Sequence, residues 1–102
     1  MRATNKAILA LSLARRAGKL MIGYDACERA AVSGRAKLIV TADDISDRTL
    51  RNIKRVSGSI RLIEAPFSQT DIQHVMGRRF VVAALTDRNF GELFVESLGQ
   101  KE

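Results

Sequence analysis

The apolar positions of this 102-residue chain follow two kinds of spacing, and the two alternate along the sequence. Three continuous apolar runs, at 37–42, 60–64 and 80–85, predict strands that are buried within a sheet. A shorter run at 19–22 predicts a fourth strand. Between these runs, apolar residues recur every three or four positions, which is typical of helices that bury one face. The pattern therefore predicts helices that alternate with strands.

Capping residues and glycines mark the expected helix ends. Thr4 or Asn5 is suited to cap the first helix, and Gly18 to end it. Ser68 and Asp71 stand at the spacing of a capping box, which marks the start of the fourth helix. The helices are expected at about 5–17, 24–33, 47–56, 69–76 and 88–98, the last capped by Thr86 or Asp87. This order predicts an α/β fold, a three-layer α-β-α sandwich around a small, mixed four-stranded sheet.

The spacing within each helix also predicts its buried face. The expected inner positions are Leu9, Ala10, Leu13, Ala14 and Ala17, with Ile8 and Leu11 widening the face, in the first helix; Tyr24, Cys27, Ala30 and Ala31 in the second; Leu50, Ile53 and Val56 in the third; Ile72, Val75 and Met76 in the fourth; and Phe90, Leu93, Phe94, Ser97 and Leu98 in the last. The alanines of the second helix imply close packing against another element.

Length and charge narrow the class of protein. A chain of 102 residues indicates one domain, residues 1–102, that can fold around its own core. Lys and Arg number 17 against 11 Asp and Glu, which gives a net charge of +6 and a pI of about 10.3. Twelve of the 17 cations are Arg, whose planar group suits bidentate contact with phosphate or guanine. A small, basic domain of this kind favours nucleic acid as its partner.

The same composition excludes several other classes. Cys27 and His74 are the single Cys and the single His, so neither an intrachain disulfide nor a Cys/His metal cluster can form, and no cofactor is expected. Arg15 and Arg16 follow the first apolar run where a signal-peptide cleavage site would need small, neutral residues. No apolar run approaches the length of a membrane span. We therefore expect a cytoplasmic protein that has no membrane partner and is a monomer.

The stretch from Gly23 to Ala30 carries the main candidate site. Gly23 breaks the first strand and opens a helix whose first turn is polar, and Arg29 lies one turn further in. A helix start of this kind suits a phosphate or a polar base edge. The basic run 15–19 before it either complements the negative end of the first helix or also contacts RNA. The turn at 77–79 can lie at the same sheet edge as Gly23, if the strand order allows it.

Other chemically notable residues have simpler explanations beside the functional ones. Asp43 and Asp44 follow a buried strand and suit either a solvated, helix-capping loop or a metal or acid–base pair. Cys27 has the inward spacing of a small core residue, and sequence alone provides no base for a nucleophile. The chain lacks a P-loop, a dinucleotide-binding glycine motif and a nucleophile elbow. An enzyme is therefore not expected.

The third helix offers a second basic surface. Its outward positions form either an ordinary solvated helix face or a docking site for an acidic partner, such as a transcription or translation factor. These positions are Arg48, Arg51, Lys54 and Arg55. A protein-interaction module is accordingly the alternative function. Aromatic residues are few, at one Tyr and four Phe, and a surface that stacks the bases of a single strand needs several exposed ones. Contact with a structured nucleic acid is therefore favoured over base stacking on a single strand.

The segments LSLARRAGKLMIGYDACERAAVSGRAKLIVTADDIS and MGRRFVVAALTDRNFGELF together resemble the kink-turn-binding ribosomal-protein superfamily, of which archaeal protein L-seven-Ae is a member, and in particular its small bacterial branch. The resemblance covers nearly the whole chain. It implies an α-β-α sandwich that binds folded RNA at a sharply kinked duplex. Members of the bacterial branch tend to be encoded beside transcription and translation factors, so the resemblance also implies ribosomal or other stable RNA as the partner.

The family motif is Gly-x-Asn-Glu-x-x-Lys. Gly23 matches its glycine and Arg29 takes the place of its lysine, whereas Asp25 stands for the asparagine and Ala26 for the glutamate. Ala26 has no acceptor for guanine, and Asp25 accepts hydrogen bonds but cannot donate them. Contact with the RNA backbone is therefore expected more firmly than base reading. The predicted RNA-binding residues are Lys19, Gly23, Tyr24, Asp25, Ala26, Arg29, Gly77, Arg78 and Arg79.

Overall fold

The computed structural model describes residues 3–99, which form a four-stranded sheet between two layers of helices. The strands are β1 (Leu20–Ile22), β2 (Leu38–Thr41), β3 (Leu62–Glu64) and β4 (Val82–Leu85), in the spatial order β1-β4-β2-β3. β4 pairs antiparallel with both β1 and β2, whereas β3 pairs parallel with β2. The sheet is therefore mixed, as the sequence predicted.

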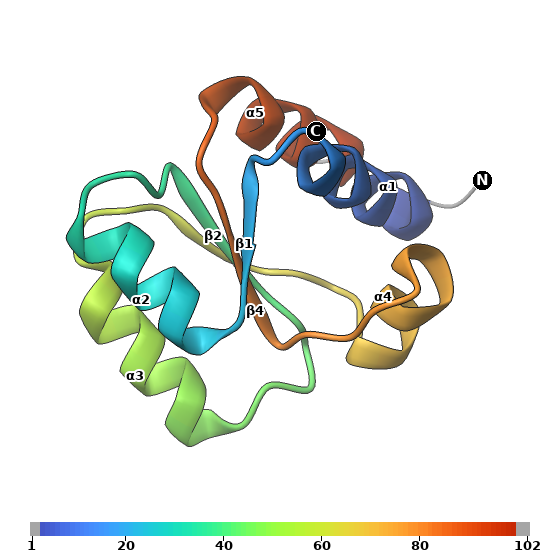
Figure 1. The fold of residues 1–102 in the computed structure, drawn as a ribbon. Helices are drawn as coiled ribbons and strands as arrows, with labels where there is room; N and C mark the ends of the chain where they lie inside the picture. Colours follow the sequence, from blue (N-terminus) through green and yellow to red (C-terminus); the bar gives the residue numbers. More distant parts are fainter. Residues whose placement is uncertain (1–2, 100–102) are drawn as a thin grey trace.

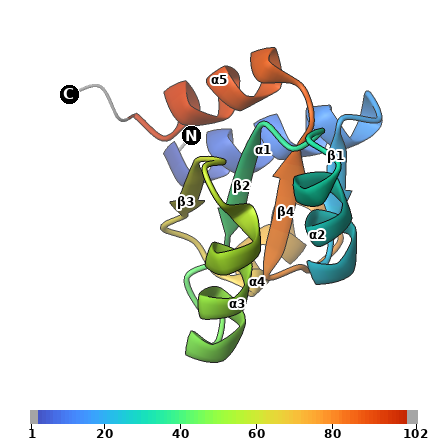
Figure 2. The same ribbon diagram turned by 90° about the vertical axis from the view of Figure 1, so that its left-hand side faces the viewer.

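The helices cover both faces of this sheet (Figure 1). The layer on one side contains α1 (Ala3–Arg16), α4 (Gln69–Met76) and α5 (Arg88–Ser97), while α2 (Tyr24–Val32) and α3 (Asp47–Ser57) form the other. Figure 2 shows α2 and α3 side by side in front of the strands. The predicted three-layer α/β sandwich is confirmed.

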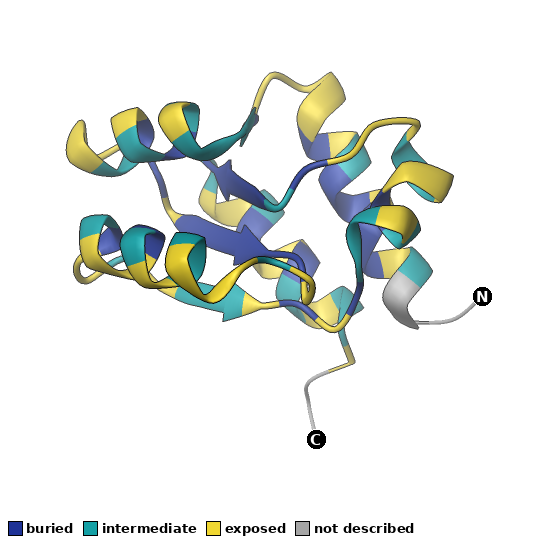
Figure 3. Ribbon diagram, turned by 90° about the horizontal axis from the view of Figure 1, so that it is seen from below, coloured by how far each residue is buried: buried dark blue, intermediate teal, exposed yellow. Residues whose placement is uncertain are grey.

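Each face of the sheet has its own hydrophobic core, because side chains alternate along a strand. Leu38 and Val40 of β2 pack with α1, α4 and α5, and Ile39 packs with α2 and α3. All residues of β2 and β4 are buried, so the central strands lie in the interior, which Figure 3 shows in dark blue. Phe67 and Phe94 meet edge to face in the first of these cores, with ring centroids 6.3 Å apart.

Three expectations about burial are wrong. Leu93 lies on the predicted inner face of α5 but is 38% exposed, whereas its neighbour Phe94 is fully buried. The strand predicted at 60–64 begins at Leu62 and is only half-buried, because β3 is the last strand of the sheet and has one neighbour. In α1, the buried positions are Ala7, Ile8, Ala10, Leu11 and Ala14, whereas Leu9 and Leu13 are 38% and 51% exposed and Ala17 is exposed. The helix is apolar over so wide an arc that its spacing fits two neighbouring stripes, and packing against the sheet decides between them.

The helix ends follow the capping chemistry in most cases. Ser68 and Asp71 form the predicted capping box of α4, and Gly77 ends that helix in the left-handed region with φ 75°. Asp87 rather than Thr86 caps α5, by accepting a hydrogen bond from the amide of Asn89. Thr4 and Asn5 do not cap α1, because the helix already begins at Ala3 and includes both.

The strand directions divide the loops between two ends of the sheet. Since β4 is antiparallel to both of its neighbours and β3 is parallel to β2, β1, β2 and β3 start at one end, where β4 finishes. We call this the Lys19 end; it comprises residues 15–19, 33–37, 58–61 and 86–88 and lies uppermost in Figure 1. The opposite, Gly23 end comprises residues 23–25, 42–48, 65–71 and 77–81, and Figure 3 views the molecule from this side.

Candidate nucleic-acid interface

Gly23 connects β1 directly to α2 through a backbone conformation that favours glycine. Its φ is 99° and its ψ is 157°, values that residues with a Cβ rarely adopt. Its amide donates to the carbonyl of Val82, which ties the turn to the start of β4 at 3.0 Å. Because glycine has no side chain to cap α2, the amides of the first turn are left to be satisfied by solvent or a ligand. This end of α2 is therefore open to an anion.

The predicted site residues of α2 differ in how they are exposed. Asp25 and Arg29 are exposed and lie one turn apart, whereas Ala26 is half-buried. Tyr24 is half-buried because it packs against the core that α2 and α3 share, so its ring serves packing. Among residues 3–99 the one ion pair joins Lys54 and Glu64, so the carboxylate of Asp25 does not hold the guanidinium of Arg29.

The turn between α4 and β4 lies at the same end of the sheet as Gly23, as the sequence suggested it would if the strand order allowed. Gly77 is exposed, and Arg78 and Arg79 follow it with exposed side chains. One guanidinium nitrogen of Arg79 donates to the Thr70 hydroxyl at 3.1 Å, which ties the side chain to α4. β4 then starts at Val82, the residue that pairs with Gly23. Two exposed cations therefore lie at the same end of the sheet as the start of α2.

Lys19 does not belong to this group. Its carbonyl accepts hydrogen bonds from the amide of Thr86 at 3.0 Å and from the Thr86 hydroxyl at 3.3 Å, at the other end of the sheet. The length of β1 separates it from Gly23, about 13 Å at roughly 3.3 Å per strand residue. The structure therefore brings six of the nine predicted residues to the Gly23 end, has Ala26 and Arg29 directly behind them on α2, and places Lys19 at the opposite end.

Sequence reasoning missed the negative charge that gathers at the Gly23 end. Five aspartates lie there against three arginines, with Arg29 a turn behind. The aspartates are Asp25, Asp43, Asp44, Asp47 and Asp71, and the arginines are Arg48, Arg78 and Arg79. Because these residues come from four separate loops, only the strand order could have revealed that they meet. The Gly23 end is thus not a basic patch, and an anion can be held there only at defined points.

The residues that the sequence offered as alternative metal or catalytic sites have structural roles instead. Asp44 accepts from the amide and the side chain of Gln69 at the start of α4, so it has the capping role that we expected of this loop. Burial raises the pKa of Cys27 to about 12, and its Sγ lies 3.7 Å from the Met21 carbonyl, so it is a protonated core thiol. In the described part of the chain, no group of metal-ligating side chains comes together and no helix is long and apolar enough to cross a membrane.

The outward face of α3 is exposed at every predicted cation. Lys54 pairs with Glu64 of β3 at 3.0 Å, and Arg55 donates to the Asn52 side chain at 3.1 Å. Arg48 and Arg51 are exposed at the remaining positions. Half of this basic face is therefore engaged in local contacts with α3 itself or with the edge strand.

Known proteins resemble this chain in sequence and in structure. No protein-family model matches the chain. The chain is 30% identical over 93 residues to the RNA-binding protein YlxQ of Bacillus subtilis (strain 168), which covers 86% of this chain and 90% of that protein. A structure of a protein with unknown function from Bacillus halodurans C has a TM-score of 0.82 at 21% identity, and covers 93% of this chain and 98% of that one.

The fold is also similar to that of an RNA-binding protein from Giardia lamblia. The Giardia lamblia 15.5kD RNA binding protein has a TM-score of 0.60 at 16% identity, with 95% of this chain and 82% of that chain covered. At this identity the likeness concerns the fold alone. The similarity in sequence to YlxQ and the similarity in fold to both structures extend over nearly the whole chain.

Proposed function

Because this chain belongs to the L-seven-Ae-like family of RNA-binding proteins, which includes YlxQ, we propose that it binds structured RNA through the Gly23 end. The relatives with an assigned function are named as RNA-binding proteins and not as enzymes. The proposed activity is accordingly binding without catalysis. The RNA is ribosomal or another stable RNA in the cytoplasm, and the protein acts as a monomer.

One observation carries this proposal, namely that the open start of α2 and the exposed turn at Arg78 and Arg79 lie at the same end of the sheet. The hydrogen bond from Gly23 to Val82 fixes the start of α2 against the first residue of β4, the strand that follows this turn. An RNA backbone that places one phosphate at the first-turn amides of α2 can place another at these arginines. Arg29, one turn along α2, offers a further cation to the neighbouring phosphate.

Base reading at this site rests on few groups. Asp25 is exposed and can accept a hydrogen bond from an amino or imino group of guanine or from cytosine N4. Ala26 offers nothing to a base. The negative charge of Asp25 also makes it a poor neighbour for phosphate. We therefore propose that the protein recognises the shape of a kinked RNA by contacting the RNA's phosphate backbone, with little discrimination among bases.

A pair of RNA oligonucleotides tests this function. One contains a kink-turn, and the other is the same duplex without the tandem G·A pairs that produce the kink. The expected result is tighter binding of the kinked RNA by about tenfold, as a backbone site that matches one shape would give. Equal affinity for the two would rule out recognition of the kink, and failure to bind either would rule out the function itself.

The alternative function uses the outer face of α3. Arg48 and Arg51 are the exposed cations of this face that the local contacts do not engage, and an acidic transcription or translation factor would suit them. A pull-down from nuclease-treated extract separates the two functions. Partners that persist without RNA, and that disappear on substitution of Arg48 and Arg51, would favour the protein-interaction module.

A further inference from the structure

We propose that the Lys19 end is a second RNA-contacting surface, which binds the phosphate backbone of the RNA held at the Gly23 end. This inference rests on the proposed function and extends its footprint to the opposite end of the sheet. The surface is formed by seven exposed cations: Arg15, Arg16, Lys19, Arg35, Lys37, Arg61 and Arg88.

The charge of the Lys19 end is the first argument. Its four segments hold these seven cations against a single carboxylate, that of Asp87, which is occupied as the cap of α5. The Gly23 end has more carboxylates than cations in its own segments. Most of the net positive charge of this chain therefore lies at the Lys19 end, which contains no residue of the family motif. Clustered Arg and Lys side chains on one side of a small protein attract the phosphates of nucleic acid.

Backbone pairing fixes how the cations are spaced. The amide of Lys37 donates to the carbonyl of Leu85 at 2.8 Å, and the amide of Thr86 donates to the carbonyl of Lys19 at 3.0 Å. Lys19 and Lys37 consequently flank the end of β4 on its two sides, about 10 Å apart at the usual strand spacing. Arg61 follows on the far side of β2, where its carbonyl accepts from Ile39 at 2.9 Å. The cations thus form a row across the end of the sheet.

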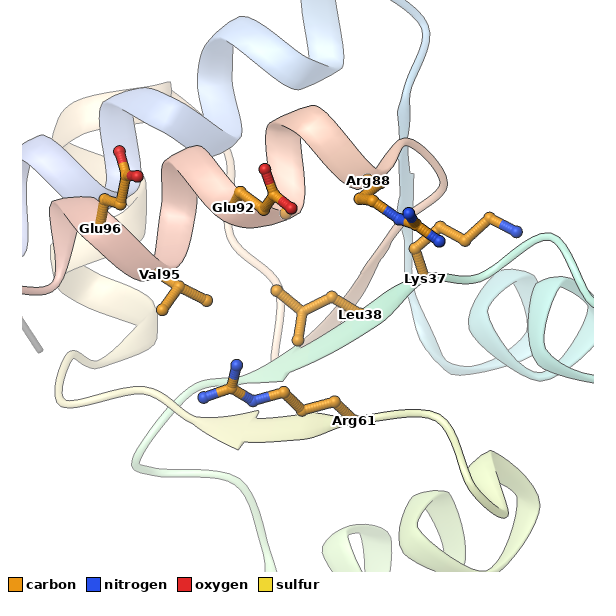
Figure 4. Close-up of a pocket in the computed structure, with 8 residues that line it drawn as sticks. Lys37, Leu38, Arg61, Arg88, Glu92, Val95 and Glu96 are labelled. Atoms are coloured by element: carbon orange, nitrogen blue, oxygen red, sulfur yellow. The ribbon is translucent and has the colours of Figure 1, made fainter.

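A hollow lies along this row, between α5 and the strands (Figure 4). It has a volume of about 440 Å³, and Lys37, Arg61 and Arg88 line it from three different elements. Leu38 and Val95 provide an apolar lining between these cations, as Figure 4 shows. None of the three cations forms an ion pair within residues 3–99. The hollow gives a phosphate and its ribose access between charges that local contacts do not neutralise.

Acidic side chains limit the direction from which RNA can approach. Glu92 and Glu96 also line the hollow, from α5, and their carboxylates are turned away from Leu38 in Figure 4. A phosphate backbone laid along α5 would meet these two charges. The RNA therefore crosses the Lys19 end over Lys19 and Lys37, and reaches Arg61 and Arg88 from that side.

The surface suits RNA better than an acidic protein. Stable protein interfaces bury an apolar centre, often with aromatic residues. The large apolar residues most exposed in the described part of the chain are Leu9, Leu13, Val32 and Leu93, and none belongs to the segments of the Lys19 end. A surface that offers cations and little exposed apolar area favours phosphates, whose binding depends on charge.

Matched triple variants test the inference. Lys37→Gln, Arg61→Gln and Arg88→Gln are combined in one protein, and Arg51→Gln, Lys54→Gln and Arg55→Gln on α3 are combined in a control with the same change of charge. Affinity is measured across a salt series for two kink-turn RNAs, one with minimal helices and one with each helix extended by about ten base pairs, enough to span a molecule 35 Å long. Thermal unfolding checks that both variants remain folded.

The expected result is specific to the longer RNA. The triple variant at Lys37, Arg61 and Arg88 should bind the longer RNA about tenfold or more weakly. The slope of log K against log salt should fall in magnitude by about 2 to 3, because each phosphate that is no longer neutralised lowers the slope by roughly one unit or slightly less. Binding of the short RNA should change by less than about threefold, as should binding of either RNA by the α3 control.

Three outcomes would overturn the inference. Equal weakening in the two triple variants would attribute the effect to overall charge. Unchanged binding of both RNAs by the first triple, while the wild type still prefers the kinked RNA, would reject the second surface and leave the proposed function standing. Disappearance of an acidic protein from a nuclease-treated pull-down, with RNA affinity unchanged, would assign the surface to a protein. If the wild type bound neither RNA, the proposed function would fail as well.

Discussion

The Gly23 end and the Lys19 end belong to one small sheet, yet they offer an RNA different things. The Gly23 end offers fixed geometry: a turn with a φ of 99°, an uncapped helix start and two arginines, among five aspartates. The Lys19 end offers charge: seven exposed cations on long side chains, and one carboxylate. Charge supplies affinity for any nucleic acid, whereas geometry distinguishes one shape from another. We therefore expect the first end to select the RNA and the second to hold it.

The largest effect is expected from Gly23→Ala, which removes the geometry without changing the charge. A Cβ at φ 99° is strained, so we expect the free energy of unfolding to fall by about 1–3 kcal/mol and binding of the kinked RNA to weaken by about tenfold or more. Urea unfolding and RNA titration measure the two effects.

Gly91→Ala provides the matched control for that change. Gly91 lies within α5, and a Cβ there would lie 3.8 Å from Leu38, which is ordinary contact. We expect the stability to be unchanged or to rise by up to about 1 kcal/mol, because alanine favours helix. An equal fall in stability in the two variants would contradict a special role for the backbone at Gly23.

Removing cations from each end in turn sharpens the comparison further. Arg78→Gln with Arg79→Gln should weaken binding of the kinked RNA by about tenfold and that of the unkinked duplex by less than about threefold. The triple variant at Lys37, Arg61 and Arg88 should bind both of these RNAs more weakly and by the same factor, provided that their helices are long. Competition titrations with the two RNAs measure this difference, and equal discrimination in both variants would contradict the division of roles.

Asp25→Asn should bring a smaller gain. The change removes a negative charge beside the predicted phosphate and supplies the donor that the family motif has at this position. We expect binding of the kinked RNA to tighten by about three- to tenfold. Asp43→Asn has the same change of charge at the same end of the sheet and should tighten binding by less than about twofold. An Asp25 variant that binds no better than the Asp43 variant would contradict a base or phosphate contact at residue 25.

The smallest expected effect belongs to Glu92→Gln at the margin of the Lys19 end. Removal of this carboxylate should tighten binding of the long RNA by about twofold at low ionic strength, and the gain should vanish at about 0.5 M salt because exposed charges are screened. Fluorescence anisotropy at two salt concentrations measures it. A gain that persists at high salt would mean that the side chain touches the RNA directly.

Local chemistry made much of the fold predictable from sequence. The capping box at Ser68 and Asp71, the end of α4 at residue 76 and the continuous apolar runs of β2 and β4 all depend on neighbours in the chain, and all were predicted. The buried stripe of α1 was not, because Leu9 and Leu13 fit one apolar stripe as well as Ile8 and Leu11 fit the other. Only packing against the sheet decided between them.

The candidate site was predictable in its parts and not in its balance of charge. Gly23 and the Arg78–Arg79 turn are recognisable as loop features, and their meeting needed only β1 beside β4. The grouping of five aspartates with them, and the separation of Lys19 from them, depend on the order and direction of all four strands. The spacing of apolar residues within a segment does not specify which distant segments pair in the sheet.

The position of β4 has a consequence for how the protein is made. β4 lies between β1 and β2, although it is the last strand along the chain, so β1 has no partner strand and β2 has only β3 until residues 82–85 have left the ribosome. Contacts over such separations form late in folding. A nascent chain that ends before β4 would contain Gly23, Lys19, Lys37 and both arginines of the turn, and would still lack either surface. We therefore expect RNA binding to begin only when synthesis has passed this strand, so that an unfinished chain does not occupy the RNA.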